Sequence, residues 1–257
     1  MLKDGAMKPL LAGIAMLASL LTPVACSPRP QPAEYPAPAA MSVAERMPLP
    51  DCAGIEAIDA GADGWTHPDC RLVVPGDAGL ALEARFRKGP DESTLVTFQV
   101  VGPGDATLQT IEETMGNTFQ PPQTQDVDLD DRADILVPLE TGNVNTNNAI
   151  WLQGEDGTFK RAGELSGVSI LNTESGYIAV QARSSAAAWS VEFWRVDGGV
   201  LFPVATAEVT ATGEDDGTVT GVSCEVLFDG DIADIGLTPK QAEKQFCAEP
   251  AAADIFK

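Results

Sequence analysis

The residues of this sequence best suited to chemistry are five aspartates that fall within nine positions: Asp126, Asp128, Asp130, Asp131 and Asp134. Ca²⁺ is a hard cation that takes about six to eight oxygen ligands, and carboxylates at alternate positions of a loop can converge on it. Asp126, Asp128 and Asp130 stand at the first, third and fifth positions, the carbonyl of Arg132 at the seventh and Asp134 at the ninth. We predict a Ca²⁺ site formed by these ligands at the odd positions: Asp126, Asp128, Asp130, Arg132 and Asp134.

Asp131 occupies the sixth position, where such loops usually carry Gly for a sharp turn. Asp tolerates a positive φ better than most residues, so the turn remains accessible. The apolar run from Ile135 to Leu139 then leaves the loop as a strand. The alternative interpretation is a solvated acidic turn before that strand.

Around this loop the sequence resembles a group of bacterial envelope proteins that carry a D-x-N-F-D-G-x-x-D loop followed by W-L…G-x-F. The matching stretches, over roughly residues 105–205, are Leu108–Ile111, Asp126–Val137, Asn148–Leu152 and Gly157–Phe159. The group includes immunity lipoproteins that protect bacteria from peptidoglycan-cleaving toxins delivered by a type IV secretion system. Their fold is similar to that of periplasmic I-type lysozyme inhibitors. The resemblance therefore implies a Ca²⁺-binding inhibitor or immunity protein.

Lysozyme inhibitors of this kind insert an S-G-x-x-Y loop into the enzyme cleft. The run Ser185-Ala186-Ala187-Ala188-Trp189 keeps the Ser and an aromatic residue but lacks the Gly and the Tyr. A tip of small residues between two β arms is narrow enough to enter a sugar-binding cleft, where Ser185 could reach catalytic carboxylates. The resemblance thus implies an inhibitor loop of Ser185, Ala186 and Trp189. The alternative is an Ala-rich hairpin with Trp189 in the core, and Ser175-Gly176-Tyr177 is a shorter match to the same motif.

The sequence gives little sign of catalysis, and we expect no enzyme and no catalytic residue. The only histidine, His67, lies between two cysteines that we expect to be bonded, and no G-x-S-x-G or phosphate-binding loop is present. A pair of carboxylates for glycoside hydrolysis is conceivable among 38 acidic residues, but no pair is singled out.

The elements that must position these residues are mainly β-strands. Apolar and alternating runs predict strands over residues 71–74, 80–86, 94–101, 107–111, 135–139, 149–152, 177–182, 189–196, 200–205 and 219–228. Three Asp-Gly pairs, at 156–157, 197–198 and 216–217, favour tight turns between them. Thr238 and Pro239 begin the one short C-terminal helix that we predict. We expect an antiparallel β-sandwich or a propeller-like β domain.

The N-terminus is typical of an export signal, with Lys8 before an apolar run from Leu10 to Leu21. The run ends at Ala25-Cys26-Ser27, which resembles a bacterial lipobox, although Pro23 replaces the usual Leu. We predict a signal peptide over 1–25, lipidation of Cys26 and a Pro-rich tether over 26–50. By the resemblance to bacterial lipoproteins, Ser27 rather than Asp after the Cys implies an outer-membrane lipoprotein facing the periplasm; without lipidation of Cys26 we expect a soluble periplasmic protein.

Residues 51–257 form the predicted β-rich domain, which could divide into an N-terminal subdomain, 51–104, and a Ca²⁺-binding core, 105–257. Four cysteines remain in this domain, an even number for an oxidising compartment. Three pairings are possible, and we favour the local one: Cys52 with Cys70 and Cys224 with Cys247. Zinc is the alternative, but the chain has no C-x-x-C and a single histidine.

The charge of the chain limits the classes of partner that we expect. The formal net charge is −22, and loss of residues 1–25 would leave 14 basic and 37 acidic residues, a net charge of −23. Nucleic acid is a poor partner for such a chain, whereas a cationic protein is a suitable one. The sequence thus favours a lipoprotein that inhibits a cationic, lysozyme-like peptidoglycan hydrolase and contacts the membrane through its lipid only. The alternative is a Ca²⁺-stabilised structural or scaffolding module of the cell envelope.

Overall fold

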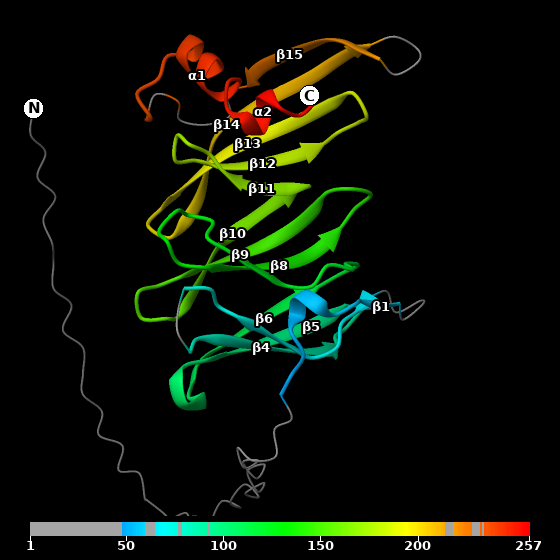
Figure 1. Cartoon of the computed structure of the whole chain (residues 1–257), viewed down its shortest axis with the longest axis vertical. Coiled ribbons are helices and arrows are strands. Elements are labelled where there is room, and N and C mark those ends of the chain that lie inside the picture. The colour runs from blue at the N-terminus through cyan, green and yellow to red at the C-terminus, as the bar shows by residue number, and fades with distance from the viewer. Residues whose placement is uncertain are drawn as a thin grey trace, which may run out of the picture. The chain divides into compact units, whose positions relative to one another are not determined.

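The computed structural model describes residues 48–59, 65–76, 79–91, 93–213, 218–227, 232 and 234–257. Its longer strands form three antiparallel sheets, each following the last along the chain (Figure 1). The N-terminal sheet contains β3 (Cys70–Val73), β4 (Ala81–Lys88), β5 (Thr94–Val101) and β6 (Thr107–Met115). The middle sheet contains β7 (Gln123–Gln125), β8 (Asp134–Thr141), β9 (Thr146–Gln153) and β10 (Phe159–Gly167). The C-terminal sheet contains β11 (Ser169–Asn172), β12 (Ile178–Arg183), β13 (Ala188–Asp197), β14 (Val200–Gly213) and β15 (Val219–Leu227).

Shorter elements complete the described part of the chain. Two-residue strands β1 (Ile58–Asp59) and β2 (Trp65–Thr66) pair with each other. The 3₁₀ turns are η2 (Cys52–Gly54) and η4 (Pro103–Asp105), and the helices are α1 (Pro239–Phe246) and α2 (Pro250–Ala253). Each large sheet is a meander in which consecutive strands are neighbours, and no sheet of the described residues closes into a barrel. The expectation of a mainly β fold is confirmed.

Period-two alternation explains how the sheets pack. In β8, Ile135 and Val137 join a core shared with the N-terminal sheet, whereas Leu136 points into a second core shared with the C-terminal sheet. A strand sends successive side chains to opposite faces, so a sheet covered on both faces needs an unbroken apolar run. The run Ile135-Leu136-Val137 meets that need. The first core contains residues from both sides of position 104, and β6 belongs to the N-terminal sheet. A subdomain boundary between residues 104 and 105 would therefore divide one sheet.

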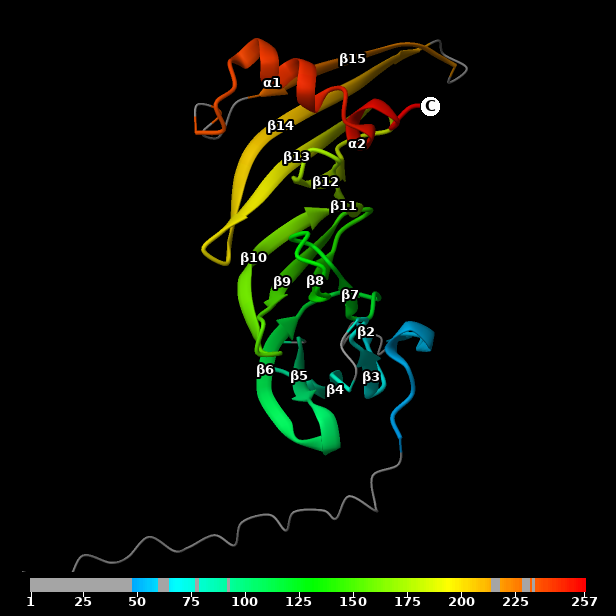
Figure 2. The same ribbon diagram turned by 60° about the vertical axis from the view of Figure 1, so that its left-hand side comes forward.

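A third core covers the other face of the C-terminal sheet with the two helices, and Figures 1 and 2 both show α1 beside β15. Phe246 of α1 packs against Phe193, with ring centroids 4.5 Å apart. Pro239 is the first residue of α1, and the Thr238 backbone N–H donates to the Gln241 side chain over 2.9 Å. Where the sequence predicted one C-terminal helix, the structure has two, because Pro250 begins another turn at an Ala-rich segment.

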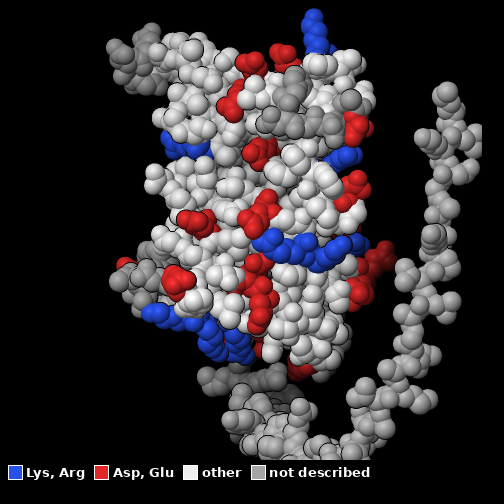
Figure 3. All heavy atoms as spheres, turned by 180° about the vertical axis from the view of Figure 1, so that it is seen from behind, with Lys and Arg blue, Asp and Glu red and all other residues white. Residues whose placement is uncertain are grey.

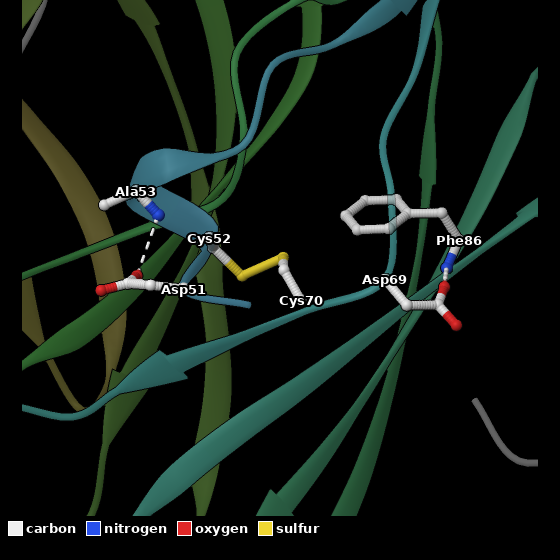
Figure 4. Close-up of a disulfide and its surroundings, with 6 residues drawn as sticks. All are labelled: Asp51, Cys52, Ala53, Asp69, Cys70 and Phe86. Carbon is white, nitrogen blue, oxygen red and sulfur yellow. Dashed lines mark hydrogen bonds between the residues drawn. A yellow bond between two sulfur atoms is a disulfide. The ribbon is translucent and has the colours of Figure 1, made fainter. Parts of the chain in front are cut away.

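Both disulfides have the local pairing favoured from the sequence, Cys52–Cys70 and Cys224–Cys247. The first joins η2 to β3, as Figure 4 shows, with the Asp51 carboxylate accepting from the Ala53 N–H over 3.0 Å. In the same view Asp69 accepts from the Phe86 N–H over 2.9 Å and fixes the start of β3 against β4. The second disulfide joins β15 to the end of α1. Two such bonds are consistent with a location outside the cytoplasm.

Two of the predicted Asp-Gly turns lie in the described residues, and both connect neighbouring strands. Gly157, between β9 and β10, has φ +74°, and Gly198, between β13 and β14, has φ +58°. The third pair, 216–217, lies outside the described residues, as do the predicted signal peptide, Cys26 and most of the tether. None of the helices that the structure describes has the length and apolar character needed to cross a membrane.

Candidate functional site

The acidic loop lies between β7 and β8 and is shaped by its first aspartate. The Asp126 carboxylate accepts from the backbone N–H groups of Leu129, Asp130 and Asp131 over 2.8, 3.2 and 3.1 Å. Leu129 and Asp131 have φ +65° and +67°. Asp131 therefore takes the left-handed conformation that the sixth position requires, without a Gly.

This turn brings three carboxylates together. One oxygen from each of Asp126, Asp128 and Asp130 lies within 4.8 Å of the others, a spacing that one cation can bridge. Oδ1 of Asp128 is buried and has no hydrogen-bond partner among the described residues. Burial raises the pKa of the Asp128 carboxyl, and the charges of Asp130 and Asp126 raise it further. A divalent cation would relieve both costs, so these residues could hold a metal ion.

Asp134, one of the two remaining predicted ligands, lies outside this group. Asp134 is fully buried, and its carboxylate accepts from the backbone N–H groups of Val127 (2.8 Å) and Gln153 (2.9 Å). Burial raises the pKa of Asp134 to about 7, although those two hydrogen bonds lower it in part. Its position is that of a brace beneath the loop, joining the start of β8 to the end of β9.

Arg132, whose carbonyl is the expected ligand at the seventh position, also brings its side chain to the loop. The guanidinium forms an ion pair with Asp130 and donates through Nε to the Gln153 carbonyl over 3.0 Å. It thereby neutralises part of the charge that Asp130 brings to the group. A cation entering this loop would share Asp130 with Arg132, which should weaken its affinity.

The loop is also tied to the C-terminal sheet, which the sequence did not indicate. The Asn172 side chain donates from Nδ2 to the Asp126 carbonyl over 2.8 Å, and the Gln125 side chain donates to the Ile170 carbonyl over 3.1 Å. Two carboxamides therefore join the ends of β7 and β11. A metal ion here would rest on both the middle and the C-terminal sheets.

The second candidate site is the turn between β12 and β13. Ser184, Ser185, Ala186 and Ala187 are all exposed, so the small-residue tip projects into solvent. The backbone N–H groups of Ser184 and Ser185 both donate to the Ala188 carbonyl over 3.0 Å. Oγ of Ser185 accepts from the Ala187 N–H over 3.2 Å, which leaves the hydroxyl hydrogen free to donate outward.

Trp189 lies half-buried at the base of this tip, outside the three cores. The guanidinium carbon of Arg183 stands 5.7 Å from the centre of its ring, a cation–π arrangement, and Nε of Arg183 donates to the Ser185 carbonyl over 3.1 Å. Asn145 supports the arm by bonding both the N–H and the carbonyl of Arg183. Arg183 is thus a residue of the tip that sequence comparison with S-G-x-x-Y missed, because it precedes that motif.

The shorter match, Ser175-Gly176-Tyr177, does not form a comparable tip. Ser175 Oγ donates to Glu249, and Tyr177 packs edge-on against Phe246 with ring centroids 5.4 Å apart. The segment is held against α1 and α2. Of the two matches, 185–189 is the one whose apex is exposed, and the Ala187 carbonyl accepts from the Ala211 N–H of β14 over 2.8 Å.

His67 is buried beside Phe86, with ring centroids 5.3 Å apart. Burial lowers its pKa and the Thr118 backbone offsets this only in part, yet neither ring nitrogen meets hydrogen-bond geometry with a described residue. The neutral imidazole packs against the Phe86 ring in the described part of the loop between the bonded cysteines. It is poorly placed for proton transfer with a substrate.

Comparison with protein-family models and with curated proteins finds no match. A solved structure described as that of a Xanthomonas type IV secretion system related protein is similar over 69% of this chain and 95% of that chain. The two share 9% sequence identity, and the TM-score is 0.39. We carry no residue role over from that protein.

Proposed function

We propose that this protein is a non-catalytic, Ca²⁺-binding inhibitor of a lysozyme-like peptidoglycan hydrolase, and that the β12–β13 tip enters the enzyme cleft. The exposed apex carries the proposal, because two of its groups keep donors that no described residue accepts: the hydroxyl of Ser185 and the terminal nitrogens of the Arg183 guanidinium, whose Nε is bonded to the Ser185 carbonyl. Glycoside hydrolases present a pair of carboxylates about 5–9.5 Å apart at the cleavage point. Donors on a narrow tip fit such a pair, whereas a carboxylate there would be repelled.

The chemistry of the tip contrasts with that of the rest of the chain. Residues 183–189 contain one Arg and no acidic residue, although the chain carries a formal charge of −22. In Figure 3 acidic side chains are spread over the visible face, with basic ones between them. An acidic body would attract a cationic enzyme from a distance, while the cationic tip would meet the carboxylates of its cleft.

The acidic loop has a supporting role in this proposal. Ca²⁺ held by Asp126, Asp128 and Asp130 would stabilise the junction at which Asn172 and Gln125 join the middle and C-terminal sheets. The C-terminal sheet includes β12 and β13, which carry the tip. Removal of the cation would then weaken inhibition indirectly. The lipid at Cys26, the Pro-rich tether and a periplasm-facing outer-membrane location belong to the same proposal.

The test begins with the partner. Periplasmic proteins would be captured on the immobilised protein, and every hydrolase recovered would be assayed for lysis of peptidoglycan with and without a stoichiometric amount of it. We expect lysis to be blocked at micromolar protein or below. Recovery of no hydrolase, together with unimpeded lysis by a panel of lysozyme-like enzymes, would contradict the proposal.

A second candidate is a Ca²⁺-stabilised scaffolding module of the envelope with no enzyme target. The bond from Asn172 to Asp126 favours it, since a cation joining two sheets needs no further role than rigidity. The two candidates differ at the tip. A scaffold would tolerate replacement of Ser185 and Arg183, and an inhibitor would not.

A further inference from the structure

A cavity of about 340 Å³ lies between the middle sheet and the first strand of the C-terminal sheet. Gln123 and Gln125 of β7, Asn148 of β9 and Ser169 of β11 line it with uncharged polar groups. Leu136 and Ile170 give it an apolar surface. The volume lies within the range of about 300–1,000 Å³ that is usual for small-ligand sites.

The lining of this cavity contains no charged residue, in a chain of which 21% is charged. Two other hollows of the described residues differ in this respect. One is lined in part by Asp51, and the other by Glu174, Glu249 and Asp254. Anions and cations would find no counter-charge in the 340 Å³ cavity, so its chemistry selects an uncharged ligand.

Several carboxamides of the cavity retain hydrogen-bonding capacity. Among the described residues, the side chains of Gln120 and Gln123 form no hydrogen bond. Nδ2 of Asn148 donates to the Thr146 carbonyl over 3.1 Å, and its side-chain oxygen accepts no hydrogen bond from the described residues. A carboxamide offers two donors and an acceptor in one plane, a set that matches neighbouring sugar hydroxyls or an acetamido group.

We propose that this cavity binds an uncharged sugar unit of a glycan, of the hexose or N-acetylhexosamine kind. The carboxamides of Gln120, Gln123 and Asn148 would bond its hydroxyl or acetamido groups, and Leu136, Pro138 and Ile170 would cover the C–H face of the ring. This goes beyond the proposed inhibition, which uses the β12–β13 tip. It would hold the domain on a polysaccharide such as the cell wall.

The cavity is linked to the acidic loop through its wall. Gln125 bonds the Ile170 carbonyl, and Asp126, the first residue of the loop, follows Gln125 directly. A cation that fixes Asp126 would therefore also fix two residues of the cavity. Sugar binding should be tighter with Ca²⁺ than with EGTA, by the reciprocity that links two sites on one protein.

The probes are the tetramers of N-acetylglucosamine and of glucose, titrated by calorimetry into the full chain in a detergent without a sugar headgroup. Binding of either tetramer supports the proposal, and the preferred one identifies the sugar. Gln123→Leu changes an exposed side chain that bonds no described residue, and it should weaken binding roughly tenfold, as expected for one or two lost hydrogen bonds.

The matched control is Asn147→Leu, on the opposite face of β9, where Asn147 bonds Glu164 over 2.8 Å outside the cavity. It should leave sugar affinity within about twofold of the wild type. A second variant, Val168→Trp, would fill the mouth of the cavity from an exposed position and should abolish binding. Absence of heat with both tetramers, or equal losses in Gln123→Leu and Asn147→Leu, would overturn the proposal. Inhibition of lysis is measured separately, so the two proposals can fail independently.

Discussion

The side-chain amide of Asn172 donates to the backbone carbonyl of Asp126 over 2.8 Å and so joins the edge of the C-terminal sheet to the acidic loop. The two residues are 46 positions apart in the sequence. Any event that orders the loop therefore acts on β11 as well. This relationship makes the stability of the C-terminal sheet responsive to what the aspartates bind.

The first prediction concerns the cation. Ca²⁺ should raise the melting temperature, because it binds the folded state alone and relieves repulsion among Asp126, Asp128 and Asp130. Asp128→Asn should abolish that rise and also increase the melting temperature in EGTA, since it removes a charge whose Oδ1 is buried without a hydrogen-bond partner among the described residues and which Asp126 and Asp130 repel. Scanning calorimetry with Ca²⁺ and with EGTA makes the measurement, and Glu174→Gln at an exposed site is the control. A melting temperature that is the same in Ca²⁺ and in EGTA would contradict the prediction.

The second prediction separates Asp134 from the three grouped carboxylates. Asp134→Ala should destabilise the protein even in EGTA, because the buried N–H groups of Val127 and Gln153 lose their acceptor. Each unsatisfied group costs about 1–3 kcal/mol. Urea denaturation gives the free energy of unfolding. If Asp134→Ala and Asp128→Asn behave alike in EGTA, Asp134 acts as one more loop carboxylate rather than as a brace.

The third prediction uses the only histidine. The pKa of His67 is lowered by burial from the ordinary 6.5, so below that pH the unfolded chain takes up a proton that the folded chain refuses. The free energy of unfolding therefore decreases as the pH falls from 6.5 toward the folded pKa, by no more than about 1.4 kcal/mol per pH unit. His67→Phe should remove the loss.

The prediction is tested on the difference between wild type and His67→Phe, because protonation of Asp134 changes the stability of both proteins in the opposite direction over the same pH range. Its pKa is raised to about 7, so the folded chain keeps a proton that the unfolded chain releases, and stability rises as the pH falls through 7. The free energy of unfolding is therefore measured for wild type and His67→Phe from pH 7.5 to 5. A difference between them that does not change with pH would show that His67 titrates normally.

The fourth prediction concerns the bond between Cys224 and Cys247. It closes a loop with a sequence separation of 23 and attaches α1 to β15 over the core formed by Phe193 and Phe246. The Cys224→Ser, Cys247→Ser double variant should lose roughly 2–4 kcal/mol of stability. Hydrogen exchange should show faster opening of α1 and β15, while β4 and β5 remain protected. Uniform loss of protection over all three sheets would show instead that the described domain unfolds as one unit.

Most strands could be predicted from the alternation of apolar and polar residues, and the failure to predict β10 has a local cause. In β10 the buried apolar side chains are those of Phe159, Ala162 and Leu165, three apart, because a bulge at residues 161–163 shifts the register. Gly163, at φ +149°, permits that bulge. A period of two is absent from such a segment, so the sequence analysis did not recognise this strand.

The candidate sites were predictable to different degrees. The alternating aspartates and the left-handed Asp131 follow from local spacing, which the sequence contains in full. Asn172 and Arg183 do not, because one reaches the loop across 46 positions and the other gains its role from the Trp189 ring on the neighbouring strand. Contacts between strands depend on register, and register was not fixed by the spacing of the apolar residues.

The most direct test of the proposed inhibition is the inhibition constant against a captured hydrolase, measured for wild type and for the Arg183→Ala, Ser185→Ala double variant. Each charged hydrogen bond contributes about 1.5–3 kcal/mol, so we predict that loss of both weakens inhibition by roughly a hundredfold to ten-thousandfold. Ser166→Ala and Arg195→Ala are the controls, since neither side chain lies at the tip. They should inhibit as the wild type does. Undiminished inhibition by the double variant would contradict the placement of the β12–β13 tip in the enzyme cleft.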